Sequence, residues 1–438
     1  MFEKIKQARR NARERVDLTR LIEDCKQLLT VRGEGNSVAI AAQALDHYSR
    51  LSSEAAQRFF EVLATDFDPD PGEVLLLAER YAVTRSPENL IRLSKAAEPP
   101  RQELLRRLNR APGATGAIVR MRAKLLDRLK HDRKLSAVDA DFEHLLSSWF
   151  NPGFLKLVQV DWSSPASLLE RIIQHEAVHE IDGWGDLRRR LEPDRRCFAF
   201  FHPVLPEEPL IFVEVALLAQ MPGAIAPLLV RSVAEDIDPL KFKVAAFYSI
   251  SNCQPGLRGV NLGNFLIKRV AERLQQEVPT VKTFCTLSPI PSFAGWLAKA
   301  EKIESERLKP LQLKLQRERL AALKQKHGRD LAGLHTANIN ERDQEALKGL
   351  CAYYLSTLSA GPGGGEAAGP GDPVARFHLN NGARLERING DADLSRKGLR
   401  QAYGLMVNYL YDLEEIEANH EKFVTGEVSA SKAVQLLM

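Results

Sequence analysis

Residues 244–297 constrain the fold more than any other part of this chain. Val244–Ser251 (VAAFYSIS) reads as a buried strand, and the turn-rich loop Asn252–Asn264 follows it. A helix and a second β-branched run, Thr280–Pro291, complete the segment. The apolar stripe of the helix consists of Leu262, Leu266, Val270 and Leu274. A strand, a glycine-containing loop, a helix start and a second strand are typical of folds that point backbone N–H groups at phosphate. The sequence therefore predicts a ligand that carries phosphate.

Composition narrows the class of protein. A chain of 438 residues is long enough for two or three domains, and 44% hydrophobic with 27% charged residues is ordinary for a globular protein. The formal net charge of +4 is too small to indicate a nucleic-acid partner. The sequence also contains no zinc-finger spacing and no RNA-binding aromatic run. We therefore expect no nucleic acid among the partners.

The cysteines and the apolar segments indicate a compartment. Five cysteines lie far apart without a CxxC pair, as in a reducing environment. The most apolar stretch, Pro209–Val230, is interrupted by Glu214, Gln220 and Pro222, so it lacks the ~20 apolar residues that a membrane span needs. The basic N-terminus contains acidic residues and lacks serine, unlike a transit peptide. We expect a cytoplasmic protein with no membrane partner.

Helix signals fill the first 150 residues. Asp70 and Ser86 each precede a proline and an apolar run, which is the pattern of a capped helix start. No strand alternation appears before Asn151-Pro152-Gly153, whereas strand and helix patterns mix after it. We therefore predict a helical domain over residues 1–150 and a domain of mixed strands and helices over residues 151–438. Within the second domain, Pro373–Ile388 carries a hairpin signal at Asn381-Gly382.

The segment His175–His179 matches the HExxH pattern of zinc peptidases. On a helix, two imidazoles one turn apart would bind zinc and the glutamate would activate water. Three features count against this reading. The helix that starts near Ser164-Pro165 meets Asp182-Gly183 just after His179, no third ligand stands at a familiar offset, and apolar neighbours explain the segment as a core helix. We expect no metal site.

Segments spread over the second half of the chain resemble the malonyl-CoA decarboxylase family, in the family's order. They are SSWFNPGFLKL (Ser147–Leu157), EAVH (Glu176–His179), RRCFAFFHP (Arg195–Pro203), FYSIS (Phe247–Ser251), GLRGVNLGNFLIKRV (Gly256–Val270), LSPIPSF (Leu287–Phe293), FHLNNGA (Phe377–Ala383) and GLMVNYLY (Gly404–Tyr411). The resemblance implies a carboxy-lyase that converts malonyl-CoA to acetyl-CoA and CO2. It also implies a homotetramer, for which the helices of residues 1–150 are reasonable assembly surfaces.

The resemblance further implies an α+β protein whose residues 151–438 form an acetyltransferase-like (GNAT-like) α/β catalytic domain with a mixed central sheet. In that fold CoA lies between two strands that splay apart, and Ser249 on the first strand is expected near the thioester. The pyrophosphate is expected on a loop made of Arg258, Gly259, Val260, Asn261, Leu262, Gly263 and Asn264. Asn261 stands where relatives carry glutamate, which puts in doubt any role there that needs a carboxylate. On spacing alone, a plain strand-to-helix turn explains this loop equally well.

The catalytic pair implied by the resemblance is Ser288 and His378, with Tyr411 as a weaker third residue that orients the histidine. The pair would hold the substrate carboxylate and relay a proton to the enolate that CO2 leaves behind. No metal or organic cofactor is needed, because the thioester itself accepts the electrons. Without the resemblance, Ser288 reads as a strand-end cap before Pro289, and His378 reads as a histidine in a hairpin.

Two further expectations concern the pocket and the reaction. The apolar wall that desolvates the substrate carboxylate is expected near Phe284, Phe293 and Trp296. The alternative function is a GNAT-type acyl-CoA-dependent acyltransferase, because the same loop and the same splayed strands would serve it. A third reading is an acyl-CoA sensor that binds CoA without turnover.

Overall fold

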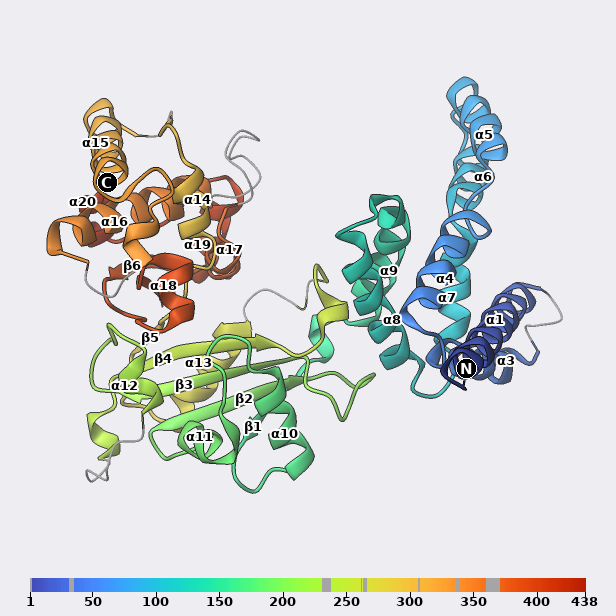
Figure 1. Ribbon diagram of the computed structural model, residues 1–438, viewed down its shortest axis with the longest axis horizontal. Helices are drawn as coiled ribbons and strands as arrows, with labels where there is room; N and C mark the ends of the chain where they lie inside the picture. The colour runs from blue at the N-terminus through green and yellow to red at the C-terminus, as the bar shows by residue number, and fades with distance from the viewer. Residues whose placement is uncertain are drawn as a thin grey trace. The chain divides into compact units, whose positions relative to one another are not determined.

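The structure is a computed structural model that describes residues 2–30, 35–230, 238–260, 262, 266–305, 308–335, 339–359 and 371–438. The chain divides into two compact units, which can be followed by colour in Figure 1. The first comprises Met1–Lys156, Phe201–Leu210 and Cys253–Leu262. The second comprises Leu157–Phe200, Ile211–Asn252 and Gly263–Met438. Two short segments from later in the chain therefore belong to the same unit as the N-terminal helices.

The described part of residues 1–150 is helical, as predicted. Its α-helices are α1 (Phe2–Leu28), α3 (Ser37–Ser49), α4 (Ser53–Thr65), α5 (Pro71–Val83), α6 (Pro87–Ala97), α7 (Pro100–Leu108), α8 (Ala114–Leu129) and α9 (Ser136–Trp149). Both predicted caps are confirmed: Asp70 Oδ1 accepts from Gly72 N at 2.8 Å, and Ser86 Oγ accepts from Asn89 N at 3.2 Å. Each cap satisfies a helix N–H that has no partner within the helix.

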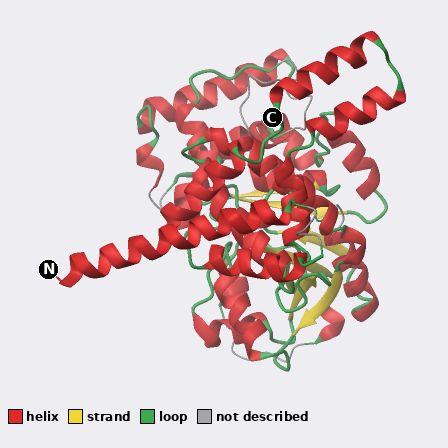
Figure 2. Ribbon diagram, turned by 90° about the vertical axis from the view of Figure 1, so that its right-hand side faces the viewer, coloured by secondary structure: helices red, strands yellow, loops and turns green. Residues whose placement is uncertain are grey.

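The second unit is built around a mixed seven-stranded sheet with the strand order β1-β2-β3-β4-β5-β7-β6. Its strands are β1 (Lys156–Val160), β2 (Arg195–Phe201), β3 (Ile211–Leu218), β4 (Val244–Asn252), β5 (Thr283–Thr286), β6 (Arg384–Asn389) and β7 (Met406–Tyr411). Figure 2 shows these strands gathered among helices. β4 and β5 run parallel, whereas the pairs β2–β3, β3–β4, β5–β7 and β6–β7 are antiparallel. The predicted α+β class with a mixed sheet is confirmed.

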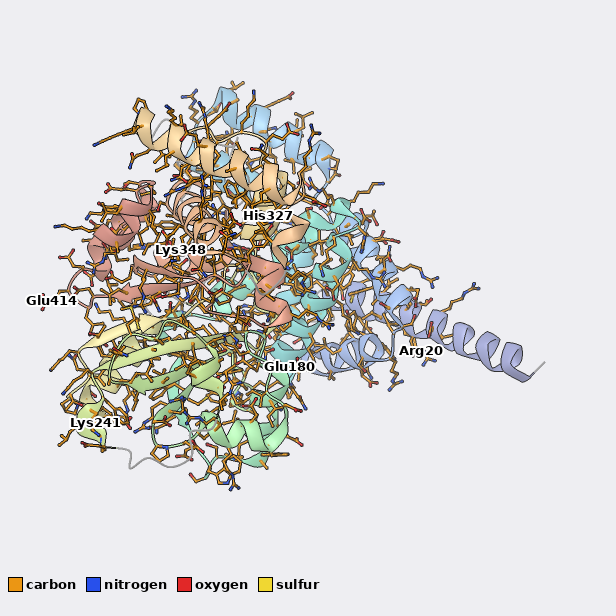
Figure 3. All side chains as sticks on the ribbon, turned by 60° about the vertical axis from the view of Figure 1, so that its left-hand side comes forward. Arg20, Glu180, Lys241, His327, Lys348 and Glu414 are labelled. Carbon is orange, nitrogen blue, oxygen red and sulfur yellow. The ribbon has the colours of Figure 1, made fainter. Side chains whose placement is uncertain are left out.

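Helices between and after the strands complete this unit. They are α10 (Ala166–His175), α11 (Gly183–Arg190), α12 (Ala226–Leu229), α13 (Leu266–Glu277), α14 (Phe293–Lys299), α15 (Pro310–His327), α16 (Glu341–Tyr353), α17 (Pro373–Asn380), α18 (Arg396–Ala402), α19 (Ile416–Val424) and α20 (Lys432–Leu437). His327, labelled in Figure 3, ends α15, and its Nε2 lies 2.8 Å from Asp343 Oδ2 of α16. Among the described residues, no helix is long and apolar enough to cross a bilayer.

The strand–loop–helix–strand arrangement predicted for residues 244–297 is confirmed in its strands and its helix. β4 and α13 lie where the pattern predicts them, and α13 buries Leu266, Val270 and Leu274 of the predicted stripe. β4 pairs with β5 from Val244↔Thr283 to Phe247↔Thr286. β4 then continues to Asn252, although β5 has ended, so the two strands part after Phe247. A register shift between Glu214 and Val215 marks a bulge in the β3–β4 pairing at the same level.

Two local predictions are wrong. Pro373–Asn380 is the helix α17 and only Arg384–Asn389 is a strand, so no hairpin forms across Asn381-Gly382. α10 ends at His175, whereas the sequence pattern extended this helix to about Val178. The HExxH segment is therefore not helical beyond its first histidine, and its two imidazoles do not lie one helical turn apart.

Candidate active site

Ser288 follows the end of β5, where hydrogen bonds from two other strands hold its backbone. Leu287 N donates to Phe247 O of β4 at 3.0 Å. Ser288 N donates to Val407 O of β7, and Val407 N donates back to Ser288 O, both at 2.9 Å. Ser288 is 5% exposed. This reciprocal bridge fixes the serine just beyond the point where β4 and β5 part.

His378 lies in the last turn of α17, and its side chain is 3% exposed. Asp372 caps this helix and Pro373 takes its first position, where a missing N–H costs nothing. The imidazole stacks on the ring of Tyr409 from β7, with ring centroids 4.7 Å apart and an interplanar angle of 28°. Stacking on Tyr409 therefore restrains the plane of the ring.

Ser288 and His378 are in direct contact. Ser288 Oγ lies 3.0 Å from His378 Nε2, and His378 Nδ1 lies 2.8 Å from the Tyr411 hydroxyl. Ser288 Oγ also donates to Thr286 Oγ1 at 2.9 Å, and Thr286 Oγ1 accepts from Tyr409 N at 3.2 Å. The side chains thus form one buried hydrogen-bonded series, Tyr411–His378–Ser288–Thr286. If the Ser288 hydroxyl donates to Thr286, His378 Nε2–H donates to Ser288 and Tyr411 donates to Nδ1.

Burial determines the charge states of His378 and Tyr411. Burial lowers the pKa of His378 to about 3, because the site favours the uncharged ring. Burial also raises the pKa of Tyr411 well above its ordinary value. Both groups are therefore neutral near pH 7. The neutral imidazole can donate the proton on one nitrogen while its other nitrogen accepts a proton. It is not an imidazolium before the reaction begins.

A cavity of about 270 Å³ opens onto Ser288 and His378. Its lining residues are Val178, Ile211, Phe247, Tyr248, Ile250, Asn252, Ser288, Pro289, Pro373, Val374, Phe377 and His378. Among the described residues, the lining contains no lysine, arginine, aspartate or glutamate, and most of its side chains are apolar. Phe284, Phe293 and Trp296, near which the apolar wall is expected from the sequence, are not among these lining residues.

The cavity lies where the sheet opens. β4 contributes Phe247, its last residue paired with β5, and also Tyr248, Ile250 and Asn252, which lie past the end of that pairing. Pro289 lies on the side of the chain that leaves β5. Separation of two parallel strands exposes edge N–H and C=O groups that would otherwise be paired. A ligand in the cavity can therefore reach the backbone of β4 as well as Ser288.

Ser249 lies on β4, but its hydroxyl is engaged elsewhere. It is 1% exposed and donates to Glu176 Oε2 at 2.6 Å. Glu176 Oε1 accepts from Val178 N at 2.7 Å and from His179 N at 2.8 Å. The glutamate of the HExxH segment thus fixes a loop against β4. Among the described residues, no group of three or more His, Cys, Asp or Glu side chains is arranged to hold a metal ion.

The described part of the expected CoA loop is anchored to the helices of the first unit. Arg122 of α8 is 1% exposed, and its Nη1 donates to Gly256 O at 3.0 Å and to Arg258 O at 2.8 Å. Gly259 has a φ of +86°, which glycine adopts without strain, and Glu143 Oε2 lies 3.0 Å from the position that a Cβ would take. Of the other expected loop residues, Val260 and Leu262 are described, whereas Asn261, Gly263 and Asn264 lie outside the described residues.

Sequence reasoning missed three residues of this site. Thr286, Tyr409 and Asp372 contact the pair or its helix, and none was singled out. Tyr409 stands two residues before Tyr411 on one strand, so the period-2 rule places both rings on one face. Asp372 precedes a proline, as Asp70 does, and that cap signal was available. Thr286 gave no signal beyond its place in a strand.

Comparison with family models gives matches over most of the chain. The model described as "Malonyl-CoA decarboxylase C-terminal domain" matches residues 153–438. The model described as "Malonyl-CoA decarboxylase N-terminal domain" matches residues 67–150. Together the two matches cover well over half of the sequence.

Relatives and solved structures give the same answer. The chain is 34% identical over 430 residues to "Malonyl-CoA decarboxylase, mitochondrial" of Anser anser anser, which covers 90% of this chain and 82% of the relative. It is 35% identical over 435 residues to the protein of the same name from Rattus norvegicus, covering 91% and 85%. The crystal structure of malonyl-CoA decarboxylase from Rhodopseudomonas palustris is similar with a TM-score of 0.84 at 46% identity, covering 96% of this chain and 99% of that one. The one from Agrobacterium vitis has a TM-score of 0.79 at 47% identity, covering 95% and 99%.

Proposed function

Because the chain belongs to the malonyl-CoA decarboxylase family, we propose that Ser288 and His378 are the pair that carries out its reaction. In that reaction malonyl-CoA loses CO2 and becomes acetyl-CoA. The observation that supports the pair most strongly is the 3.0 Å contact between Ser288 Oγ and His378 Nε2 at the wall of an uncharged cavity. Tyr411, 2.8 Å from Nδ1, orients the imidazole.

The apolar lining favours loss of CO2. The described lining residues include no cation, so a carboxylate that enters the cavity loses hydration and gains only neutral hydrogen-bond donors from them. The bond to CO2 breaks with its electrons moving into the thioester carbonyl, so the charge that burial disfavours moves from the carboxylate to the thioester oxygen. Backbone N–H groups of β4 beside the cavity, with that of Ser249 among the candidates, would stabilise this oxyanion. Such donors typically contribute about 10²–10³-fold.

Ser288 is then placed to protonate the enolate. The enolate carbon takes the proton of the Ser288 hydroxyl, and the serine oxygen takes the Nε2 proton of His378. Water that enters the site reprotonates the imidazole, directly or through the Tyr411 hydroxyl, and the hydroxide that remains combines with the released CO2 as bicarbonate. A neutral histidine suits this relay, since burial lowers its pKa to about 3 and no imidazolium is stored. We propose no metal or organic cofactor, because the thioester itself accepts the electron pair.

The proposal for CoA rests on the loop and the parted strands. Arg258, Gly259, Val260, Asn261, Leu262, Gly263 and Asn264 are the residues proposed to bind the pyrophosphate. Arg122 supports this by donating to the carbonyl groups of Gly256 and Arg258, which fixes the backbone at the start of the loop. The parallel β4–β5 pair that separates after Phe247 supports a GNAT-like fold for the catalytic domain. A crystal soaked with CoA would test the loop and the fold together.

The dyad is tested by Ser288→Ala and His378→Asn. Each should lower the rate of CO2 release roughly 10²-fold or more, because each removes a group in the proton relay. Calorimetric titration with acetyl-CoA should give nearly unchanged affinity for both variants. Wild-type turnover in both variants would remove the dyad from the account.

The alternative of a GNAT-type acyltransferase is favoured by the parted strands alone. An assay that supplies malonyl-CoA without any acyl acceptor and measures CO2 and acetyl-CoA distinguishes this activity from decarboxylation. Stoichiometric release of both would exclude an obligate acyltransferase. Loss of turnover after exhaustive chelation would contradict the proposal that no metal takes part.

Assembly and location are further proposals. We propose a homotetramer in which α5 and α6 contribute an interface, since neither helix contains a buried residue. The division into an assembly domain, residues 1–150, and a catalytic domain, residues 151–438, is part of that proposal. The animal relatives carry the word mitochondrial in their names. For this chain we propose the cytoplasm, which cell fractionation would test.

A further inference from the structure

Asp372 is a buried carboxylate that contacts both catalytic segments. Asp372 is 0% exposed. Oδ1 accepts from Val374 N at 3.0 Å and from Ala375 N at 3.1 Å, which caps α17 six residues before His378. Oδ2 accepts from Ser292 N at 3.0 Å, four residues after Ser288. One side chain therefore joins two segments that lie far apart in the sequence.

Both connections from Asp372 to the dyad are stiff. Between Ser292 and Ser288 stand Pro291 and Pro289, whose rings fix φ near −65°. Between Asp372 and His378 the chain is helical from Pro373 onward. A shift of the carboxylate relative to Ser292 is therefore transmitted to the Oγ–Nε2 distance rather than absorbed by flexible chain.

Asp372 is itself anchored from a third side. Its backbone N donates to Ser359 Oγ at 3.1 Å. At Gly371 a Cβ would stand 2.6 Å from Leu358 O, so only glycine lets the chain approach this closely. Burial raises the pKa of Asp372, and the three N–H groups at 292, 374 and 375 oppose that rise. The carboxylate is thus held by neutral backbone donors, as its contacts require.

The opposite side of the dyad is fixed by β7. Val407 bonds the backbone of Ser288, Tyr409 stacks on the imidazole, and Tyr411 contacts Nδ1. These contacts position the serine and the ring but not the first turn of α17. Without the bond from Asp372 to Ser292, the first turn of α17 keeps its own cap but loses its hydrogen bond to the segment that carries Ser288.

We propose that Asp372 is a positioning residue that sets the Ser288–His378 distance by joining the Ser292 amide to the cap of α17. It is absent from the cavity lining, so it acts through the dyad and not on the substrate. The inference rests on the proposed roles of Ser288 and His378. It assigns the carboxylate a role beyond capping, which would need one oxygen only.

The variant Asp372→Ser separates the two roles. Serine is a good N-cap and keeps bonds to the helix amides, but its shorter side chain does not reach Ser292. We expect the thermal midpoint within a few degrees of wild type, a KM for malonyl-CoA within about twofold, and kcat at least tenfold lower. Hydrogen exchange at the Ser292 amide should speed up. The matched control is Asp70→Ser. Asp70 is also a capping aspartate before a proline, and its described hydrogen-bond partners are amides of its own helix.

Asp372→Asn provides the second variant, since it fills the same volume. Its single oxygen satisfies either the cap or Ser292, so kcat should lie between wild type and Asp372→Ser. Wild-type kcat in both variants, or parallel losses of kcat, KM and thermal midpoint, would overturn the proposal. So would an equal cost of Asp372→Ser in the wild-type and Ser288→Ala backgrounds, because a residue acting through the dyad is not additive with it. Ser288→Ala alone judges the dyad, so the two failures remain distinguishable.

Discussion

At the scale of single residues, neutrality is the property that governs this site. Ser288, His378 and Tyr411 are buried and share hydrogen bonds, yet none carries a charge near pH 7. A buried charge would attract water and counter-charges, whereas neutral donors solvate an enolate only when it forms. The chain Tyr411–His378–Ser288 therefore serves proton transfer better than charge storage.

Tyr411→Phe tests the far end of that chain. The change leaves His378 Nδ1 without its partner at 2.8 Å, and an unsatisfied buried group costs about 1–3 kcal/mol. We expect kcat to fall roughly tenfold or more with KM little changed in steady-state assays. Tyr409→Phe is the matched control, because it keeps the ring that stacks on the imidazole. Equal losses in the two variants would mean that ring packing, not the Tyr411 hydroxyl, matters.

The buried imidazoles also predict how stability depends on pH. Burial lowers the pKa of His378 to about 3 and that of His179 to about 4 from an ordinary value of 6.5. As pH falls below 6.5 the unfolded chain binds these protons and the folded chain does not, so stability is lost. Each buried imidazole lowers the free energy of unfolding by up to about 1.4 kcal/mol per pH unit of acidification, until the pH reaches its pKa in the folded protein.

The measurement is the free energy of urea unfolding between pH 6 and 4.5. On acidification, the free energy of unfolding of His378→Asn should fall less steeply than that of wild type. The difference in slope should equal the contribution of one buried imidazole. His144→Asn, at an exposed position, is the control. Identical slopes for wild type and His378→Asn would contradict a neutral buried His378.

At the scale of elements, patterns local in sequence were predicted well. β4, α13 and the caps of α5 and α6 follow from periodicity and from N-cap residues before proline. The hairpin predicted at Asn381-Gly382 is wrong because Asp372-Pro373 starts a helix, a local signal that outweighs the turn dipeptide. Gly382, with a φ of +78°, instead joins α17 to β6.

The site could not be predicted from local pattern. Ser288 and His378 are 90 residues apart, and their contact depends on how β5, β7 and α17 pack. Each residue by itself also fits a cap or a core position, so composition does not distinguish them. The family resemblance supplied the pair. Thr286 was missed because its role arises from contacts made only in the folded chain. Asp372 carried a cap signal in the sequence, but its bond to Ser292 also forms only in the folded chain.

The link between α8 and the CoA loop gives a prediction at this scale. Arg122→Met removes donors to Gly256 O and Arg258 O and leaves Asp139 and Glu143 without their cation. We expect KM for malonyl-CoA to rise about tenfold, the effect of roughly 1.4 kcal/mol, with a smaller change in kcat. Arg120→Met, an exposed arginine on the same helix, should behave as wild type. An unchanged KM in Arg122→Met would separate this loop from CoA binding.

At the scale of the whole molecule, α5 and α6 stand out. Helices normally bury an apolar face, yet these two leave large apolar side chains exposed, among them Leu75 at 62%, Val83 at 87% and Ile91 at 55%. Such a surface fits an interface between copies of the chain better than a surface in water.

Replacing Leu75, Val83 and Ile91 with glutamine should reduce the mass measured by light scattering after gel filtration. Because these residues lie on helices far in sequence from the dyad, kcat per chain should change little. The control replaces the exposed polar residues Glu79, Arg92 and Lys95 with glutamine and should keep the wild-type mass. An unchanged mass in the apolar variant would contradict the proposed interface.

The most direct test of the central claim is a crystal structure with a malonyl-CoA analogue whose carboxylate is replaced by a sulfonate, which cannot leave as CO2. We expect the sulfonate in the cavity lined by Phe247, Ile250 and Phe377, within hydrogen-bond reach, about 2.6–3.2 Å, of Ser288 Oγ or His378 Nε2. An analogue bound with its acyl end elsewhere, out of reach of both side chains, would rule out the proposed roles of Ser288 and His378.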